Sequence, residues 1–295
     1  MGLFFLLVPL GALGTLAVCV WGSGMTDRYA VFGNPVAHSK SPQIHALFAQ
    51  QTGQDIQYDA LLAPLDGFER SVHEFMAAGG RGANVTVPFK EQAFRVATQL
   101  TARARAAGAV NTLMFADDAI VGDNTDGTGL VADIQSNLGV WIAGTRVLLL
   151  GAGGAARGVI LPLLEEAPSS LVIANRTADK ARQLVDHFSD EAAGVMTSVT
   201  FEQLANHAFD LVINATSAGL DDAGMPLPDS IFAPGCLAYE MLYGRETPFL
   251  RQARRANARV ADGLGMLVEQ AAEAFFVWRG VHPDTAAVLA TMRSK

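Results

Sequence analysis

A glycine-rich stretch follows an apolar run in the middle of the chain. Residues 146–150 read Arg-Val-Leu-Leu-Leu, and residues 151–156 read Gly-Ala-Gly-Gly-Ala-Ala. A G-x-G-x-x-A turn between a strand and a helix is typical of a dinucleotide site. Gly151 permits the sharp turn, and Gly153 lets the backbone approach a pyrophosphate at the helix N-terminus. Glycine-rich strand ends also serve as plain turns, so the stretch predicts a phosphate site only together with its neighbours.

The next predicted strand, 171–174, ends at Asn175, Arg176 and Thr177. An NAD site usually carries Asp or Glu at this point for the ribose 2′-hydroxyl, and neither is present. The Arg176 guanidinium can instead pair with a 2′-phosphate, to which its neighbours can add hydrogen bonds. This strand end therefore indicates NADP. The alternative, a surface arginine in a turn, leaves the missing acid unexplained.

A lysine follows a predicted strand that has one polar face. Asn84 and Thr86 alternate with Val85 and Val87, so the two pairs are expected on opposite sides, and the strand ends just before Lys90. A single lysine is usually a solvated surface residue. Here the polar face presents an amide and a hydroxyl beside the lysine, which favours a cleft.

Two further positions have both a structural and a chemical interpretation. Ser41 precedes Pro42 and is predicted as a helix N-cap. Ser39 and Ser41 together also offer two hydroxyls at a positive helix end, which suits a carboxylate. Asp126 is either the N-cap of a helix or an acid/base group at the edge of a cleft, and the local sequence leaves both open.

Alternating strands and helices must position these side chains, and they predict an α/β fold of parallel βαβ units throughout. With 295 residues, the chain is expected to form two domains. A final helix is predicted over 266–279, where Gln270 is the polar exception on an apolar face. Strands are expected at 29–32, 57–61, 84–87, 110–113, 120–121, 146–150, 171–174, 196–200, 209–213, 236–241 and 259–262.

The composition excludes several classes of protein. Half of the residues are hydrophobic and 17% are charged, with a formal net charge of −8, which disfavours general nucleic-acid binding. The two cysteines, Cys19 and Cys236, form neither a metal-ligand cluster nor a disulfide framework, so we expect no metal and a reducing compartment.

Residues 1–24 differ from the rest of the chain. This extension carries no charged side chain, and its apolar run from Leu3 to Trp21 could just span a bilayer. It lacks the basic start of a signal peptide. There are three interpretations of this extension: a membrane anchor, an uncleaved signal-like segment, or a translated upstream region before a true start at Met25. The sharp change in composition favours the last.

The motifs together resemble those of shikimate dehydrogenase, and the resemblance covers 25–295. It implies an N-terminal α/β substrate domain over 25–126 and a Rossmann-type, doubly wound NADP-binding domain over 127–261. Helices in 262–295 would pack back onto the substrate domain, and residues 1–24 have no counterpart. Eight motifs occur in the family's order: 29–35 with 38–42, 84–90, 109–112, 124–127, 151–154, 175–177, 214–217 and 263–270.

The resemblance also implies roles for individual residues. The reaction would be the reversible NADPH-dependent reduction of 3-dehydroshikimate to shikimate, in aromatic amino-acid biosynthesis. Lys90 and Asp126 would be the catalytic pair and would also contact substrate. The other substrate-binding residues would be Ser39, Ser41, Thr86, Asn111, Tyr243 and Gln270. Cofactor would be bound by Gly151, Ala152, Gly153, Gly154, Ala155, Asn175, Arg176, Thr177, Thr216, Gly263 and Met266.

Two alternatives share this scaffold: a quinate/shikimate dehydrogenase that uses NAD, and a non-catalytic NADP-sensing protein. Arg176 disfavours the first, and the presence of both Lys90 and Asp126 disfavours the second. The chain departs from the family at Glu240, where Asp is expected, and in a short turn at 244–246. We expect a cytoplasmic monomer or homodimer, with a membrane partner only if residues 1–24 are an anchor.

Overall fold

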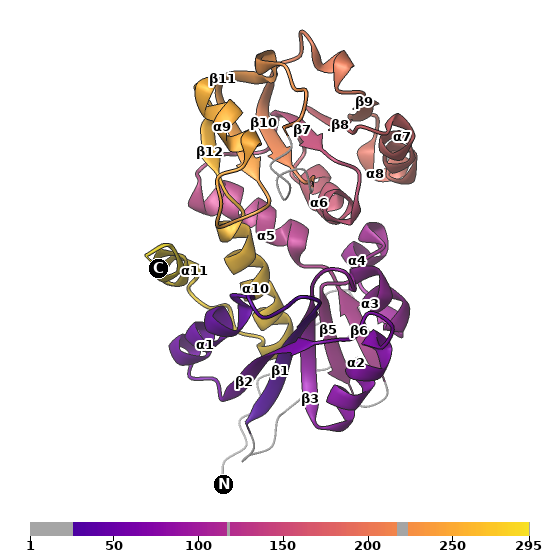
Figure 1. Cartoon of the computed structure of the whole chain (residues 1–295), viewed down its shortest axis with the longest axis vertical. Coiled ribbons are helices and arrows are strands. Elements are labelled where there is room, and N and C mark those ends of the chain that lie inside the picture. Colours follow the sequence, from indigo (N-terminus) through magenta and orange to yellow (C-terminus); the bar gives the residue numbers. More distant parts are fainter. Residues whose placement is uncertain (1–25, 117–118, 217–223, 295) are drawn as a thin grey trace, which may run out of the picture.

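The computed structural model describes residues 26–116, 119–216 and 224–294. Two six-stranded sheets follow one another along the long axis of the molecule (Figure 1). Asp117 and Asp118 separate two predicted strands, and the sequence predicts a turn there; this turn and the apolar extension 1–24 lie outside the described residues. Within the described ranges, no helix is both long enough and apolar enough to cross a membrane.

The N-terminal sheet is mixed, with the strand order β2-β1-β3-β5-β6-β4. Strand β5 runs antiparallel to both β3 and β6, so the prediction of parallel units throughout is wrong for this sheet. A parallel connection needs a crossover of about a dozen residues, and only two residues separate β5 from β6. The strands are β1 (Asp27–Gly33), β2 (Ile56–Leu62), β3 (Gly80–Val85), β4 (Gln99–Leu100), β5 (Thr112–Ala116) and β6 (Ala119–Asp123).

Strand β3 ends earlier than the alternating pattern predicts. Val85 is buried, but Val87 is 66% exposed, because the chain leaves the sheet after Val85. Register then gathers polar residues at one end of the sheet: Asn84 lies opposite Thr112, and Thr112 lies opposite Asp123.

The C-terminal sheet is entirely parallel, with the order β12-β11-β10-β7-β8-β9. This is the doubly wound dinucleotide-binding order, which confirms the predicted fold class. Leu149 and Leu150 enter cores on opposite faces, so both faces are covered and the strand is apolar throughout. The strands are β7 (Arg146–Leu150), β8 (Ser170–Ala174), β9 (Met196–Val199), β10 (Phe209–Asn214), β11 (Phe232–Glu240) and β12 (Arg259–Ala261).

Helix α10 (Leu264–Arg279) returns from the second sheet to the first (Figure 1). It packs with α1 (Ser41–Thr52) and α11 (Thr285–Arg293) in one apolar cluster that includes Phe48 and Phe275. Helix α10 lies very close to α5 (Asp126–Ala132): a Cβ on Gly129 would lie only 2.6 Å from the backbone nitrogen of Gln270. The absence of that Cβ brings Gln270 toward the start of α5.

The remaining helices cover the two sheets. A π-helical turn, Asp133–Asn137, directly continues α5. The other helices are α2 (Phe68–Ala77), α3 (Lys90–Val96), α4 (Ala102–Ala107), α6 (Gly154–Glu165), α7 (Ala178–His187), α8 (Ser189–Ala192) and α9 (Pro248–Arg255).

Candidate active site

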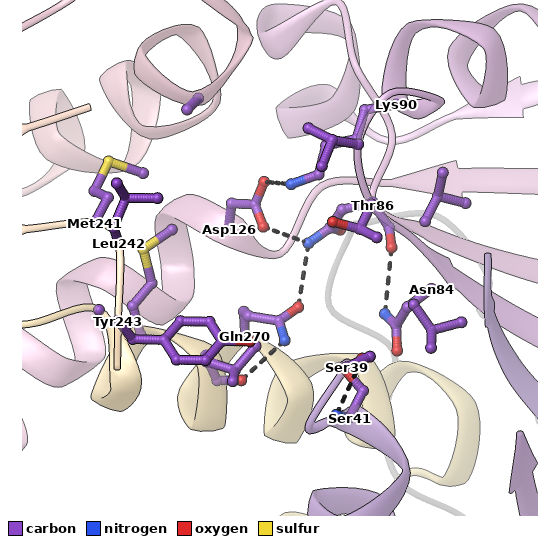
Figure 2. Close-up of a pocket in the computed structure, with 18 of the residues that line it drawn as sticks. Ser39, Ser41, Asn84, Thr86, Lys90, Asp126, Met241, Leu242, Tyr243 and Gln270 are labelled. Carbon is purple, nitrogen blue, oxygen red and sulfur yellow. Dashed lines mark hydrogen bonds and ion pairs between the residues drawn. The ribbon is translucent and has the colours of Figure 1, made fainter. Parts of the chain in front are cut away.

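A cavity of about 440 Å³ lies where the polar end of the first sheet meets strand ends of the second sheet and the start of α10 (Figure 2). It brings together all eight residues expected to bind substrate. Four of the residues expected at the cofactor also line it. These twelve are Ser39, Ser41, Thr86, Lys90, Asn111, Asp126, Tyr243, Gln270, Ala155, Thr216, Gly263 and Met266.

Lys90 and Asp126 form an ion pair inside this cavity. The Lys90 Nζ lies 2.5 Å from Asp126 Oδ2 (Figure 2). Each residue is the first of a short helix, and Thr125 rather than Asp126 occupies the N-cap position of α5. The N-cap interpretation of Asp126 is therefore wrong. Its carboxylate faces the cavity, where it can hold an ammonium group in place.

Asn111 fixes the other oxygen of this carboxylate. Its Nδ2 donates to Asp126 Oδ1 at 2.8 Å, while its Oδ1 accepts from the backbone N–H of Thr125 at 2.8 Å. The Thr125 bond dictates which end of the amide faces Asp126. Gln270 Oε1 also accepts from Asn111 Nδ2, at 3.3 Å. Gln270 is only 9% exposed, so it is not an ordinary solvated helix residue.

The two serines lie together at the start of α1 (Figure 2). Ser39 Oγ accepts from the backbone N–H of Ser41 at 3.3 Å. Lys40 occupies the N-cap position and makes no side-chain capping bond, so the prediction of Ser41 as the N-cap is wrong. Both serines line the cavity, at a helix end that favours negative charge.

Sequence reasoning missed a layer behind these serines. Tyr58 donates its hydroxyl proton to Asn84 Oδ1 at 2.7 Å, and the His45 ring stacks on Tyr58 with centroids 4.1 Å apart. His45 is fully buried, and neither of its ring nitrogens has a hydrogen-bond partner among the described residues. Burial lowers the pKa of His45 to about 3. The one available signal was that His45 lies one helical turn after Ser41.

The glycine turn has the geometry of a phosphate site. Gly151 has φ +109°, and a Cβ there would lie 3.2 Å from the Ala215 carbonyl. A Cβ on Gly153 or Gly154 would meet no atom within 4 Å. Helix α6 begins at Gly154 without a side-chain cap, which leaves its first N–H groups available to an anion. Ala152 and Ala155 belong to the same turn.

Asn175, Arg176 and Thr177 do not line the cavity itself. They follow β8, whose last residue Ala174 pairs with Leu150 at the end of β7, so they lie one strand from the glycine turn. Arg176 is exposed, and Asn175 Nδ2 donates to the Thr177 carbonyl at 2.9 Å. The arrangement leaves the guanidinium open to a phosphate.

The opposite wall comes from β10, β11 and the start of α10. Thr216 Oγ1 donates to Asn214 Oδ1 at 2.7 Å, and the Met266 N–H donates to the Tyr239 hydroxyl at 3.2 Å. The Lys40 ammonium lies 5.9 Å from the centre of the Tyr243 ring. Despite the departures from the family at Glu240 and in the following turn, Tyr243 reaches the cavity.

Three family models match successive parts of the chain. The shikimate dehydrogenase substrate binding domain matches 31–113, shikimate / quinate 5-dehydrogenase matches 133–220, and the shikimate 5′-dehydrogenase C-terminal domain matches 263–293. The chain belongs to the shikimate dehydrogenase family. The identification made from the sequence motifs is confirmed.

Individual relatives and solved structures are similar to this protein over most of the chain. The NADP(+) shikimate dehydrogenase of Dechloromonas aromatica is 63% identical over 273 residues, covering 92% of this chain and 99% of the relative. An Ael1 enzyme from Pseudomonas putida has a crystal structure with a TM-score of 0.87 and 50% identity, covering 90% of this chain and 97% of that one. For the Thermus thermophilus shikimate 5-dehydrogenase with NADP(H) and shikimate, the TM-score is 0.81 at 34% identity, with 91% and 99% covered.

Proposed function

We propose that this protein is an NADP-dependent shikimate dehydrogenase, which reversibly reduces 3-dehydroshikimate to shikimate in aromatic amino-acid biosynthesis. The observation that carries the proposal is the ion pair between Lys90 and Asp126 in a cavity that also reaches the glycine turn. A proton donor and an uncapped helix N-terminus thus border one space, as a ketone reductase requires.

Substrate binding is assigned by the chemistry of the cavity walls. Ser39 and Ser41 hold the carboxylate through their hydroxyls at the start of α1, a helix end that favours negative charge. The hydroxyl groups are bound by Thr86, Asn111, Asp126 and Gln270, with Tyr243 nearby. The fixed amide of Asn111 supports this assignment, because an oriented donor can distinguish a hydroxyl from a hydrogen atom.

Lys90 supplies the proton. Negative charge develops on the carbonyl oxygen during reduction, and the ammonium stabilises and protonates that oxygen. Asp126 positions the ammonium and shares the proton of the substrate hydroxyl. In the reverse direction Lys90 accepts the hydroxyl proton.

The residues present fit NADP, which when bound supplies or accepts a hydride. Open space over Gly153 and Gly154 lets the pyrophosphate approach the backbone, with Gly151, Ala152 and Ala155 completing the turn. Arg176, flanked by Asn175 and Thr177, binds the 2′-phosphate. Thr216, Gly263 and Met266 border the nicotinamide, and their place on the cavity wall supports this.

The two alternatives are less well supported. An NAD-dependent quinate/shikimate dehydrogenase would leave the exposed Arg176 without a partner phosphate. A non-catalytic NADP sensor would have no use for the buried carboxylate–ammonium pair. Curated relatives that share about 60% of their residues with this chain carry the name shikimate dehydrogenase (NADP(+)).

We also propose the domain boundaries 25–126, 127–261 and 262–295, a cytoplasmic location, and a monomer or homodimer. The mass of the native N-terminus tests the location, since a product that begins at Met25 or Thr26 lacks the apolar extension and cannot be anchored by it. Gel filtration with light scattering gives the oligomeric state.

Lys90→Ala tests the central assignment. Loss of a general acid typically costs about 10²- to 10⁴-fold in rate, so kcat for NADP reduction by shikimate should fall by that factor while NADPH still binds. Arg255→Ala, which removes an exposed cation at the end of α9, is the matched control and should keep wild-type turnover. Unchanged kcat in Lys90→Ala would remove Lys90 from the mechanism, and an inactive wild-type protein would refute the proposed reaction.

A further inference from the structure

Glu240 is a fully buried carboxyl group at the carboxyl end of β11. Among the described residues, no lysine, arginine or histidine forms an ion pair with it; its polar neighbours are hydrogen-bond donors. A buried carboxylate without a cation is costly unless donors replace its hydration. We therefore expect the buried Glu240 carboxyl group, at a strand end of the parallel sheet, to have a specific role.

Three donors converge on Glu240 from three different segments. Asn214 Nδ2 and Thr247 Oγ1 donate to Glu240 Oε2 at 2.7 and 2.8 Å. The backbone N–H of Leu242 donates to Oε1 at 3.2 Å. Asn214 and Thr247 are themselves buried, at 1% and 0% exposure, so water cannot easily substitute for the carboxylate. The carboxylate thus joins the end of β10, the segment after β11 and the N-cap of α9.

Through its hydrogen bond to Asn214, Glu240 also determines the position of Thr216. Because Asn214 Nδ2 faces Glu240, its Oδ1 must face the other way, where it accepts from both the N–H and the Oγ1 of Thr216, at 3.1 and 2.7 Å. An Asn214 amide turned round would place its oxygen against the Glu240 carboxylate, which is an acceptor, and its NH₂ against the Thr216 N–H, which is a donor. Glu240 therefore dictates the orientation of Asn214, which in turn fixes Thr216 on the cavity wall.

Glu240 also holds the segment that follows β11. Met241, Leu242 and Tyr243 all line the cavity (Figure 2). The N–H of Leu242 bonds the Glu240 carboxylate at one end of this segment, and Thr247 bonds the same carboxylate where α9 begins. Both ends of the connection between β11 and α9 are held by one side chain.

We infer that Glu240 is a positioning residue that holds the nicotinamide side of the cavity in its binding geometry, through Asn214 to Thr216 and through Leu242. The inference rests on the proposed function, because Thr216 matters only if a nicotinamide lies beside it. Glu240 does not reach the cavity, so it acts through these neighbours and not by touching the cofactor.

Glu240→Gln is the decisive variant, because it keeps the shape and removes one acceptor. Whichever way the new amide is turned, its NH₂ faces at least one of the three donors. One buried donor then loses its partner. This loss lowers the equilibrium constant for the binding geometry by roughly a factor of ten or more. The dissociation constant for NADPH should rise about tenfold, while KM for shikimate changes less than about twofold. Glu240→Asp, which keeps a carboxylate, should recover most of the NADPH affinity.

The measurements are a fluorescence titration with NADPH, steady-state kinetics in both substrates, and thermal unfolding. Glu202→Gln, an exposed glutamate of the same domain, is the matched control. A lower Tm with unchanged NADPH affinity and kcat would reduce Glu240 to a structural role and overturn the inference. In a double-mutant cycle with Thr216→Val, the effects on NADPH affinity should be non-additive; additivity would exclude the route through Asn214.

If Glu240→Gln does not fold, Asn214→Ala carries the test. It cuts the link to Thr216 but leaves Glu240 bonded to Thr247 and Leu242, and it should weaken NADPH binding by a similar factor. Unchanged binding would overturn the inference. Failure of the proposed function is distinguishable, because the wild-type protein would then fail to bind NADPH or to oxidise shikimate.

Discussion

The buried histidine behind the serines makes stability depend on pH in a way that one substitution should remove. His45 is fully buried, stacks on Tyr58 and contacts the rings of Phe48, Phe275 and Trp278, with no partner for either nitrogen. His45→Phe keeps a planar ring there and removes the ionisable group. The expected result is a chain whose free energy of unfolding falls less on acidification.

The magnitude follows from the two pKa values. Burial lowers the pKa of His45 to about 3 in the folded protein, whereas an unfolded histidine titrates near 6.5. Between these values the unfolded chain binds about one more proton than the folded chain, so stability decreases by about 1.4 kcal/mol for each pH unit of acidification. From pH 6.5 to pH 4.5 the wild-type protein should therefore lose about 2 to 3 kcal/mol more than His45→Phe.

Urea unfolding of both proteins at pH 7.5, 6.5, 5.5 and 4.5 gives this difference directly, because other groups titrate equally in both. His73→Gln is the control, since it removes an exposed histidine and leaves the buried His45 ring in place. Parallel curves for wild type and His45→Phe would refute the reasoning, because they would show that His45 binds its proton equally in the folded and unfolded chains.

Two further substitutions test other contacts. Arg176→Ala should lower kcat/KM for NADP by roughly tenfold or more through loss of a charged phosphate contact, with little change for NAD; an equal loss with both cofactors would contradict the 2′-phosphate assignment. Gly265→Ala should destabilise the fold by about 1 to 3 kcal/mol, because its Cβ would lie 1.9 Å from Asp133 Oδ1. A thermal shift compares it with Gly224→Ala, whose Cβ would meet no atom of the described residues within 4 Å; equal Tm values would show that Asp133 moves freely.

The sequence predicted the second sheet well, because its strands are short apolar runs buried on both faces. It also located the polar strand ends, since Asn84 lies on a predicted strand and Lys90 and Asp126 follow predicted strands. Their convergence depends on register between β3, β5 and β6, and the antiparallel pairing was missed although the two-residue connection was visible. The helix N-terminus at Ser41 was misplaced by one residue, a difference within the usual uncertainty of helix ends.

The layer of buried polar groups could not be predicted from the sequence. His45 and Glu240 resemble ordinary helix and strand residues until tertiary packing removes water from them. The resemblance to the family flagged Glu240 as a departure, but gave no reason for its burial. The donors to the buried carboxylate, such as Asn214 and Thr247, come from positions far apart in the chain. No local sequence pattern predicts that they lie together.

The return of α10 to the first sheet has a consequence for synthesis of the protein. Met266 and Gln270 lie on that helix, close to the C-terminus, and both line the cavity. A nascent chain on the ribosome can complete every strand of both sheets before these two side chains emerge. The binding cavity therefore closes only after every strand of both sheets has been synthesised, and a chain truncated before α10 would lack these two parts of its wall.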